Sequence, residues 1–180
     1  MIEEILKYNK AFVENEGYRE FATSKYPDKQ LAILTCMDTR LTTMLPAALG
    51  LSNGDAKIIK NAGGLVISPF DSAMRSLIVA IYELGVKEVM VIAHSGCGAC
   101  HMNGKKMKEL MLERGIKPHD IGIVEHCGIN LDTWLEGFHD TEDSVRQTVA
   151  TITAHPLIPE DVSVSGFIID SDTGRLTPVE

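Results

Sequence analysis

Short apolar runs alternate with amphipathic helical stretches along this chain, and this alternation limits the possible fold more than any other feature. QLAILTC (residues 30–36) and KEVMVIAH (87–94) are short and nearly continuous, as expected for strands buried on both faces of a sheet. AKIIK (56–60) predicts a further strand, while LTTMLPAALG (41–50) and DSAMRSLIVAIYELG (71–85) have the spacing of helices. Strands joined by helices favour right-handed crossovers, and therefore predict an α/β fold with a mainly parallel four-stranded sheet and helices on both faces.

The remaining segments extend this expectation. MIEEILKYNKAFVENEG (1–17) predicts an acidic amphipathic helix, and TEDSVRQTVATITAH (141–155) predicts a helix capped by Thr141. GACHMNGKKMKELMLERG (98–115) predicts a helix interrupted near Gly104, and residues 118–138 predict short helical pieces, with Trp134 in the core or an interface. VSVSGFIID and RLTPV flank the turn SDTG, which predicts a C-terminal antiparallel edge strand.

Length and composition exclude several classes of protein. The 180 residues contain no repeat or linker, so we expect a single domain over residues 1–180. A net charge of −8 argues against a nucleic-acid partner, and no apolar run approaches the roughly 18 residues of a membrane span. Without signal-peptide features at the N-terminus, a cytoplasmic location is expected. Four cysteines in such a chain indicate metal or thiol chemistry rather than a disulfide scaffold.

The reactive residues fall where strands end. Cys36 ends the first strand, NAGG follows the second, and His94 ends the third. Because ligands in such sheets bind beyond the carboxyl ends of the strands, this edge is the expected site. His94 and Cys97 are three residues apart and can turn toward one ion, with Cys36 as a third ligand. Two thiolates and one imidazole suit zinc and leave a fourth position open, whereas soft sulfur ligands disfavour magnesium or calcium.

Other uses of the cysteines stay open at this point. Cys97 and Cys100 form a C-x-x-C sequence that could act as a dithiol redox pair. Cys97, Cys100 and His101 could instead belong to a structural zinc site, although CMDTR would then be unexplained. We interpret His126 and Cys127 as core or surface residues.

CMDTR (36–40), KNAGG (60–64) and HSGCG (94–98) together resemble the signatures of the β-class carbonic anhydrases, and GFIIDSDTGRL resembles their short prokaryotic branch. The resemblance implies one zinc ion per chain, held by Cys36, His94 and Cys97. It implies reversible hydration of carbon dioxide to bicarbonate by metal-bound hydroxide. Hydrolysis of CS2 or COS at the same zinc is an alternative, as is a non-catalytic zinc protein in which Asp38 is a permanent fourth ligand.

The resemblance also suggests roles for the neighbouring residues. Asp38 is expected to accept a hydrogen bond from the metal-bound water, and Arg40 to grip Asp38 in a fork of charge-assisted bonds. The alternative for this pair is a helix cap with a surface ion pair. Gly98 and Gly63 are expected on the substrate side, although Gly63 and Gly64 could be turn glycines only.

The hypothesis of a carbonic anhydrase also includes the oligomeric state and the residue that passes the released proton to the solvent. The resemblance implies a homodimer, or a higher oligomer built from dimers, with the pocket at the interface. The N-terminal helix, residues 1–20, would then pack on the partner subunit, with packing on its own domain as the alternative. His101 could export the proton, but a surface histidine is the preferred interpretation.

Overall fold

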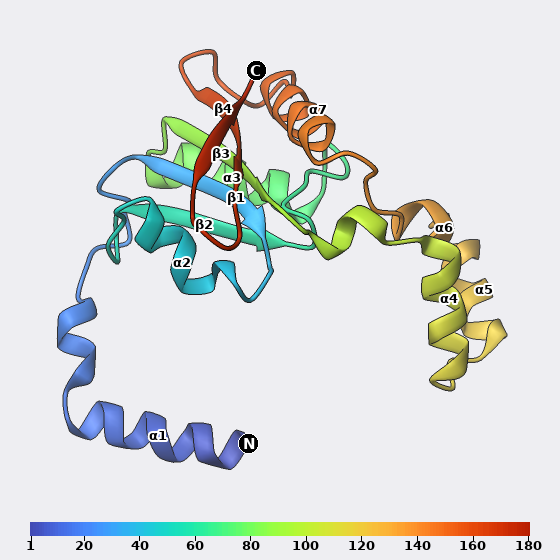
Figure 1. The fold of residues 1–180 in the computed structure, drawn as a ribbon, viewed down its shortest axis with the longest axis horizontal. Coiled ribbons are helices and arrows are strands. Elements are labelled where there is room, and N and C mark those ends of the chain that lie inside the picture. Colours follow the sequence, from blue (N-terminus) through green and yellow to red (C-terminus); the bar gives the residue numbers. More distant parts are fainter.

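The computed structural model describes all 180 residues, which build a five-stranded sheet with the strand order β2-β1-β3-β4-β5 (Figure 1). The strands are β1 (Leu31–Cys36), β2 (Ala56–Asn61), β3 (Glu88–His94), β4 (Ser163–Ile169) and β5 (Leu176–Val179). β1 to β4 are parallel, and β5 pairs antiparallel with β4 at the edge. The predicted fold class, with four parallel strands and a C-terminal antiparallel edge strand, is confirmed.

The helices lie between and beyond these strands. They are α1 (Ile2–Glu14), η1 (Gly17–Phe21), α2 (Leu41–Ala48), α3 (Ser72–Leu84), η2 (Gly98–His101), α4 (Gly104–Glu113), α5 (Pro118–His126), α6 (Leu131–Trp134) and α7 (Thr141–Thr153). α3 shows why its boundaries were predictable. Its N-cap Asp71 accepts a hydrogen bond from the backbone of Met74, and Gly85 ends it at a φ of +73°. No helix has the length and apolarity needed to cross a membrane.

Both faces of the central strands are buried, as their continuous apolar sequences predicted. Along β1, Ala32 and Leu34 join the core beneath α3 and α7, while Leu31 and Ile33 join the core beneath α2. This alternation follows from the two-residue period of a strand. β1 and β3 are thereby fixed in register at the centre of the sheet, and their carboxyl ends lie at one edge.

Several local expectations need comment. The helix after β3 is interrupted as predicted, because η2 and α4 are separate elements. Thr141 as the cap of α7 was wrong: the Asp140 carboxylate accepts the hydrogen bond from the backbone of Asp143, and Thr141 is the first helical residue. Trp134 was expected in the core or an interface; the core is excluded because 54% of this residue is exposed, and an interface position stays a prediction.

Two parts of the chain extend away from the sheet, α1 with η1 on one side and α4 to α6 on the other (Figure 1). α1 contains no buried residue, although its sequence is amphipathic. Most of its large apolar side chains are more than half exposed: Ile2, Ile5, Leu6, Tyr8 and Val13. A helix with such a face ordinarily buries it against another surface.

Candidate metal centre and active site

The sheet brings together three side chains that are distant in the sequence. Cys36 ends β1, His94 ends β3, and Cys97 follows in the turn that leads to η2. Because β1 and β3 are parallel neighbours, with Thr35 opposite Ile92, their carboxyl ends deliver Cys36 and His94 to one place. All three side chains are buried, and their ligand atoms lie within 4.8 Å of one another.

The distances within this group fit a tetrahedral metal ion. The sulfur atoms of Cys36 and Cys97 are 3.8 Å apart. Two sulfurs at about 2.3 Å from a shared tetrahedral zinc ion would be separated by about 3.8 Å. The separation is far too long for a disulfide, and both cysteines are free thiols. The arrangement therefore fits zinc without rearrangement of the two sulfurs.

The two ring nitrogens of His94 have different surroundings. Nδ1 lies 3.0 Å from the carbonyl oxygen of Ser95 and donates to it when protonated. Nε2 is buried and has no hydrogen-bond partner. With the proton on Nδ1, the Nε2 lone pair is free for a metal, which is the usual way in which a second hydrogen bond orients a histidine ligand.

The electrostatics of the two thiols are unequal when no cation lies between them. Burial opposes ionisation of Cys36, but the neighbouring His94 imidazole and the backbone N–H groups of Asp38 and Gly63 lower its pKa to about 7. Burial, together with the charge of Cys36, raises the pKa of Cys97 to about 11. Two thiolates this close repel each other, and a divalent cation would relieve that repulsion. The two thiols therefore favour a cation between them, as the ligands of a metal site do.

Asp38 and Arg40 form a two-pronged ion pair beside these residues. Arg40 Nε donates to Asp38 Oδ1 at 3.0 Å and Nη2 donates to Oδ2 at 2.8 Å, while the Arg40 backbone N–H also reaches Oδ1. These hydrogen bonds hold the pKa of the Asp38 carboxyl well below its usual range. Asp38 Oδ2 is 3.7 Å from Nε2 of His94, so the fixed carboxylate borders the candidate metal position.

The loop after β2 passes directly beneath Cys36. Gly64 has a φ of +70°, and a Cβ added there would lie 2.9 Å from the Cys36 backbone nitrogen. Only glycine permits both the conformation and this approach. Gly64 therefore has a specific packing role. At Gly98, by contrast, φ is not in the left-handed region and an added Cβ would meet no atom within 4 Å.

A cavity of about 360 Å³ opens beside the ligands. Cys36, Cys97 and Asp38 line it together with Met37, Thr39, Ala62, Gly63, Gly98, Ala99 and Met102. Gly63 and Gly98, expected on the substrate side, both contribute to its wall. The methionine and alanine side chains were not predicted, because apolar residues in loops carry no signal that distinguishes a pocket wall from ordinary packing.

The other candidate residues lie outside this group. The Cys100 thiol faces the carbonyl oxygen of His139 at 3.6 Å and does not belong to the metal-competent cluster. His101, His126 and Cys127 are exposed. Sequence reasoning missed Ser95 and Ser171, which hydrogen-bond to each other beside Arg40. Ser171 lies two residues after the end of β4, and this place at the carboxyl edge of a strand was the available signal.

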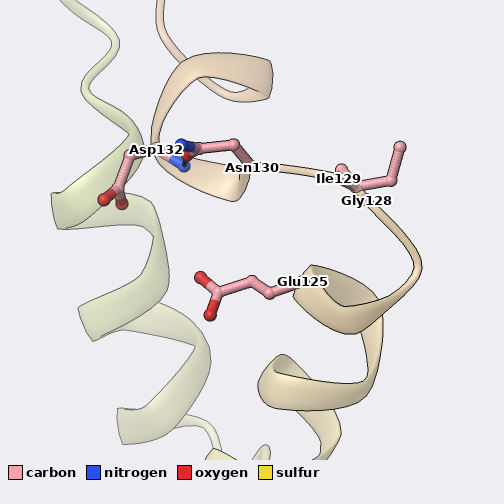
Figure 2. Close-up of a pocket in the computed structure, with 5 residues that line it drawn as sticks. All are labelled: Glu125, Gly128, Ile129, Asn130 and Asp132. Carbon is pink, nitrogen blue, oxygen red and sulfur yellow. Dashed lines mark hydrogen bonds between the residues drawn. The ribbon is translucent and has the colours of Figure 1, made fainter.

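A second cavity, of about 350 Å³, lies among the peripheral helices and is lined by Glu125, Gly128, Ile129, Asn130 and Asp132 (Figure 2). Lys108 of α4 forms ion pairs with both of its carboxylates. The Lys108 Nζ is 2.7 Å from Asp132 Oδ1 and 3.3 Å from Glu125 Oε1. The acidic groups therefore hold α4, α5 and α6 together through Lys108. The metal-competent group lies elsewhere, at the carboxyl edge of the sheet.

Fold and site together define an α/β enzyme with its reactive groups at the carboxyl edge of a parallel sheet. Residues 31–176 match the family model described as carbonic anhydrase. The chain therefore belongs to the β-carbonic anhydrase family, as the sequence resemblance implied.

Individual relatives agree with this assignment. The Bacillus subtilis protein YvdA, named as a candidate carbonic anhydrase, is 47% identical over 175 residues, which cover 97% of this chain and 89% of YvdA. The crystal structure of β-carbonic anhydrase isoform I from Trichomonas vaginalis superposes with a TM-score of 0.90 at 35% identity, covering 99% of this chain and 97% of that one. The carbon disulfide hydrolase of Saccharolobus solfataricus is 31% identical over 161 residues, covering 83% of this chain and 76% of the hydrolase.

Proposed function

We propose that the protein catalyses the reversible hydration of carbon dioxide to bicarbonate, with one zinc ion per chain held by Cys36, His94 and Cys97. The observation that carries this proposal is the buried Cys-His-Cys group, with its 3.8 Å sulfur separation and its unpartnered imidazole nitrogen. A zinc ion held by these residues would supply Lewis acidity, which lowers the pKa of a bound water. A reducing, cytoplasmic location suits the free thiols.

Asp38 and Arg40 orient the reaction in this proposal. Both carboxylate oxygens of Asp38 accept hydrogen bonds from Arg40, and the carboxyl is ionised throughout the physiological range. An ionised carboxylate can only accept hydrogen bonds, so Asp38 accepts one from the attacking water and aims an oxygen lone pair at the substrate. Because Arg40 anchors it, Asp38 stays out of the fourth ligand position, and this supports an open site over a permanently closed one.

The neighbouring cavity suits a small apolar substrate. Met37, Ala62, Ala99 and Met102 supply apolar walls, while Gly63 and Gly98 keep the space near the ligands clear. Carbon dioxide is linear and carries no net charge, so apolar contact and a few backbone groups suffice to hold it. Gly98 lets a backbone N–H approach the bicarbonate product.

Hydrolysis of carbon disulfide is the second candidate, and the similarity to the Saccharolobus solfataricus hydrolase favours testing it. The same Cys-His-Cys group would serve, and the difference would lie in how the substrate enters. Assaying CO2 hydration beside CS2 and COS hydrolysis on one preparation decides between the two activities.

We also propose that residues 1–180 form one domain that acts as a homodimer, or as a higher oligomer built from dimers. The proposal rests on α1, which extends away from the sheet with its apolar side chains exposed (Figure 1). A second copy of the chain is the natural surface for that face. The absence of any buried residue in α1 supports this proposal over packing of the helix on its own domain.

The decisive experiment is stopped-flow CO2 hydration with metal analysis of the same samples. We expect about one zinc per chain in the native protein, loss of zinc in Cys97→Ser, and a fall in kcat of about 100-fold in Asp38→Ala with zinc retained. Asp172→Ala is the matched control, because Asp172 is an exposed carboxylate on the turn near Arg40 that makes no hydrogen bond to it. A native protein with full zinc and no CO2 hydration would refute the proposal, and unchanged turnover in Cys100→Ser would exclude a dithiol mechanism.

A further inference from the structure

Besides its hydrogen bonds to Asp38, the Arg40 guanidinium donates two others. Nη1 donates to the hydroxyl of Ser171 at 3.2 Å, and Nη2 donates to the carbonyl oxygen of Gly96 at 3.0 Å. Ser171 is 131 residues away in the sequence and lies in the turn between β4 and β5. The C-terminal hairpin therefore reaches the Asp38–Arg40 pair directly.

Ser171 is itself rigidly placed. The residue is buried, with 8% of its surface exposed. Its backbone N–H donates to the Ser95 hydroxyl at 2.9 Å, and its own hydroxyl lies 3.2 Å from the Ser95 carbonyl oxygen and 3.1 Å from the Ser95 hydroxyl. A hydroxyl has one proton and two lone pairs. The three contacts use this one proton and these two lone pairs. The Ser171 hydroxyl accepts hydrogen bonds from Arg40 and from the Ser95 hydroxyl, and it donates to the Ser95 carbonyl oxygen.

The same network reaches the candidate metal ligand. The Ser95 carbonyl oxygen that faces Ser171 also faces Nδ1 of His94 at 3.0 Å. The sheet fixes this geometry, because His94 at the end of β3 is paired with Ile169 at the end of β4, and the Ser95 N–H donates to the Ile169 carbonyl. Ser171, two residues further on, stands at a fixed position relative to both His94 and Arg40.

We propose that Ser171 is a positioning residue for the reaction, which holds the Arg40 guanidinium so that Arg40 in turn holds the Asp38 carboxylate at the correct angle. This inference rests on the proposed function. Arg40 is a long side chain that is 45% exposed, and without an anchor it would sample many rotamers. Ser171 anchors Nη1 from a buried position, while the Gly96 carbonyl accepts from Nη2. Ser171 touches neither the substrate nor the metal position in this role and acts through Arg40.

The test compares four variants of the full-length, zinc-loaded protein. Ser171→Ala removes the hydroxyl, Ser171→Thr keeps it, and Ser171→Val matches the shape of threonine without it. Thr173→Ala is the control, because Thr173 is in the same turn and bonds to Asp170, not to Arg40. We expect kcat for CO2 hydration to fall about tenfold in the alanine and valine variants, with KM and zinc content unchanged. Threonine should restore most of the activity, and Thr173→Ala should keep native kcat.

A second readout follows Arg40 without reference to activity. In protein labelled with 15N-arginine, the Nε–H signal of Arg40 reports solvent exchange, and it can be assigned by its absence in Arg40→Lys. We expect this exchange to be about tenfold faster in Ser171→Ala than in the native or Thr173→Ala protein, with or without zinc. Faster exchange would show that Ser171 restrains the guanidinium.

Two results would overturn the proposal. One is a Ser171→Ala protein with native kcat and native Arg40 exchange. The other is an equal loss of activity in Ser171→Thr and Ser171→Val, since shape and not the hydroxyl would then be responsible. Failure of the proposed function gives a different pattern: the native protein itself would lack CO2 hydration, while the exchange of the Arg40 Nε–H would still decide whether Ser171 holds it.

Discussion

Replacing Gly64 by alanine should damage both the stability of the fold and its affinity for zinc. Gly64 has a φ of +70°, which costs an L-residue about 1–2 kcal/mol. The added Cβ would also lie 2.9 Å from the backbone nitrogen of Cys36 and 2.9 Å from the carbonyl carbon of Thr35. Backbone atoms of a central strand cannot move aside cheaply, and overpacking of this kind costs about 1–3 kcal/mol. We therefore expect a total loss of about 2–5 kcal/mol in the free energy of unfolding.

Gly85→Ala separates the two contributions. Gly85 has nearly the same φ, +73°, but a Cβ there would meet no atom within 4 Å. The control variant thus carries the conformational cost alone. The excess loss in Gly64→Ala measures the displacement of the strand that bears Cys36, and this displacement should also weaken zinc binding.

Urea unfolding of the metal-free proteins gives the stability difference, and competition with a coloured chelator gives the zinc affinity. We expect Gly64→Ala to unfold at lower urea than Gly85→Ala and to bind zinc at least about tenfold more weakly, while Gly85→Ala binds zinc as the native protein does. If the two variants lose equal stability and bind zinc equally well, the close approach of this loop to Cys36 does not matter to the site.

Four further outcomes follow from the geometry of the site and of α1. In metal-free protein, iodoacetamide should modify Cys36 near pH 7 and Cys97 only at more alkaline pH, because the thiolate is the nucleophile and the pKa values are about 7 and about 11. Zinc should protect both thiols. Equal rates of modification at pH 7 would contradict this difference in pKa. CO2 hydration should rise between pH 6 and pH 9, since two thiolate ligands reduce the acidity of the water at the metal. Asp38 does not cause this rise, because its pKa is lowered and the carboxylate is already deprotonated over that range; a flat profile of kcat would count against the mechanism. Arg40→Lys keeps the charge but cannot form the two-pronged contact, so stopped-flow assays should show kcat lowered at least about tenfold with zinc retained. Leu6→Glu places a charge on the exposed apolar face of α1 and should shift the protein toward monomer in size-exclusion chromatography with light scattering, whereas an unchanged oligomer would remove α1 from the interface.

Sequence reasoning could predict the fold because its signals were local. Continuous apolar runs identified the central strands, and a glycine or a capping aspartate marked the ends of α3. The meeting of Cys36 with His94 and Cys97 followed from one topological rule, that the carboxyl ends of parallel strands share an edge. Two thiols and an imidazole at that edge predict a metal-competent group, and their ligand atoms do lie within 4.8 Å of one another.

Other features could not be predicted, because they depend on long-range packing. Ser171 reaches Arg40 only because β4 lies beside β3, and nothing local to either residue specifies that adjacency. Aspartate and threonine are both common at helix N-caps, so the sequence alone does not choose between Asp140 and Thr141. The backbone path into α7 makes Asp140 the cap. A tryptophan suits a core or an interface equally by residue type, and only the position of its short helix among the peripheral elements shows that Trp134 is not in the core.

The parallel pairing of β1 with β3 also determines when the candidate metal group can form. Cys36 and Cys97 are 61 positions apart, so an ion bound by both closes a large loop of the chain. Treated as a cross-link, such a loop removes about 4 kcal/mol of conformational entropy from the unfolded ensemble. A chain emerging from the ribosome has only one of the three ligands until β3 has been synthesised and aligned. Under the proposed function, zinc uptake would then be a late event in maturation, and the ion would link strands that have already paired.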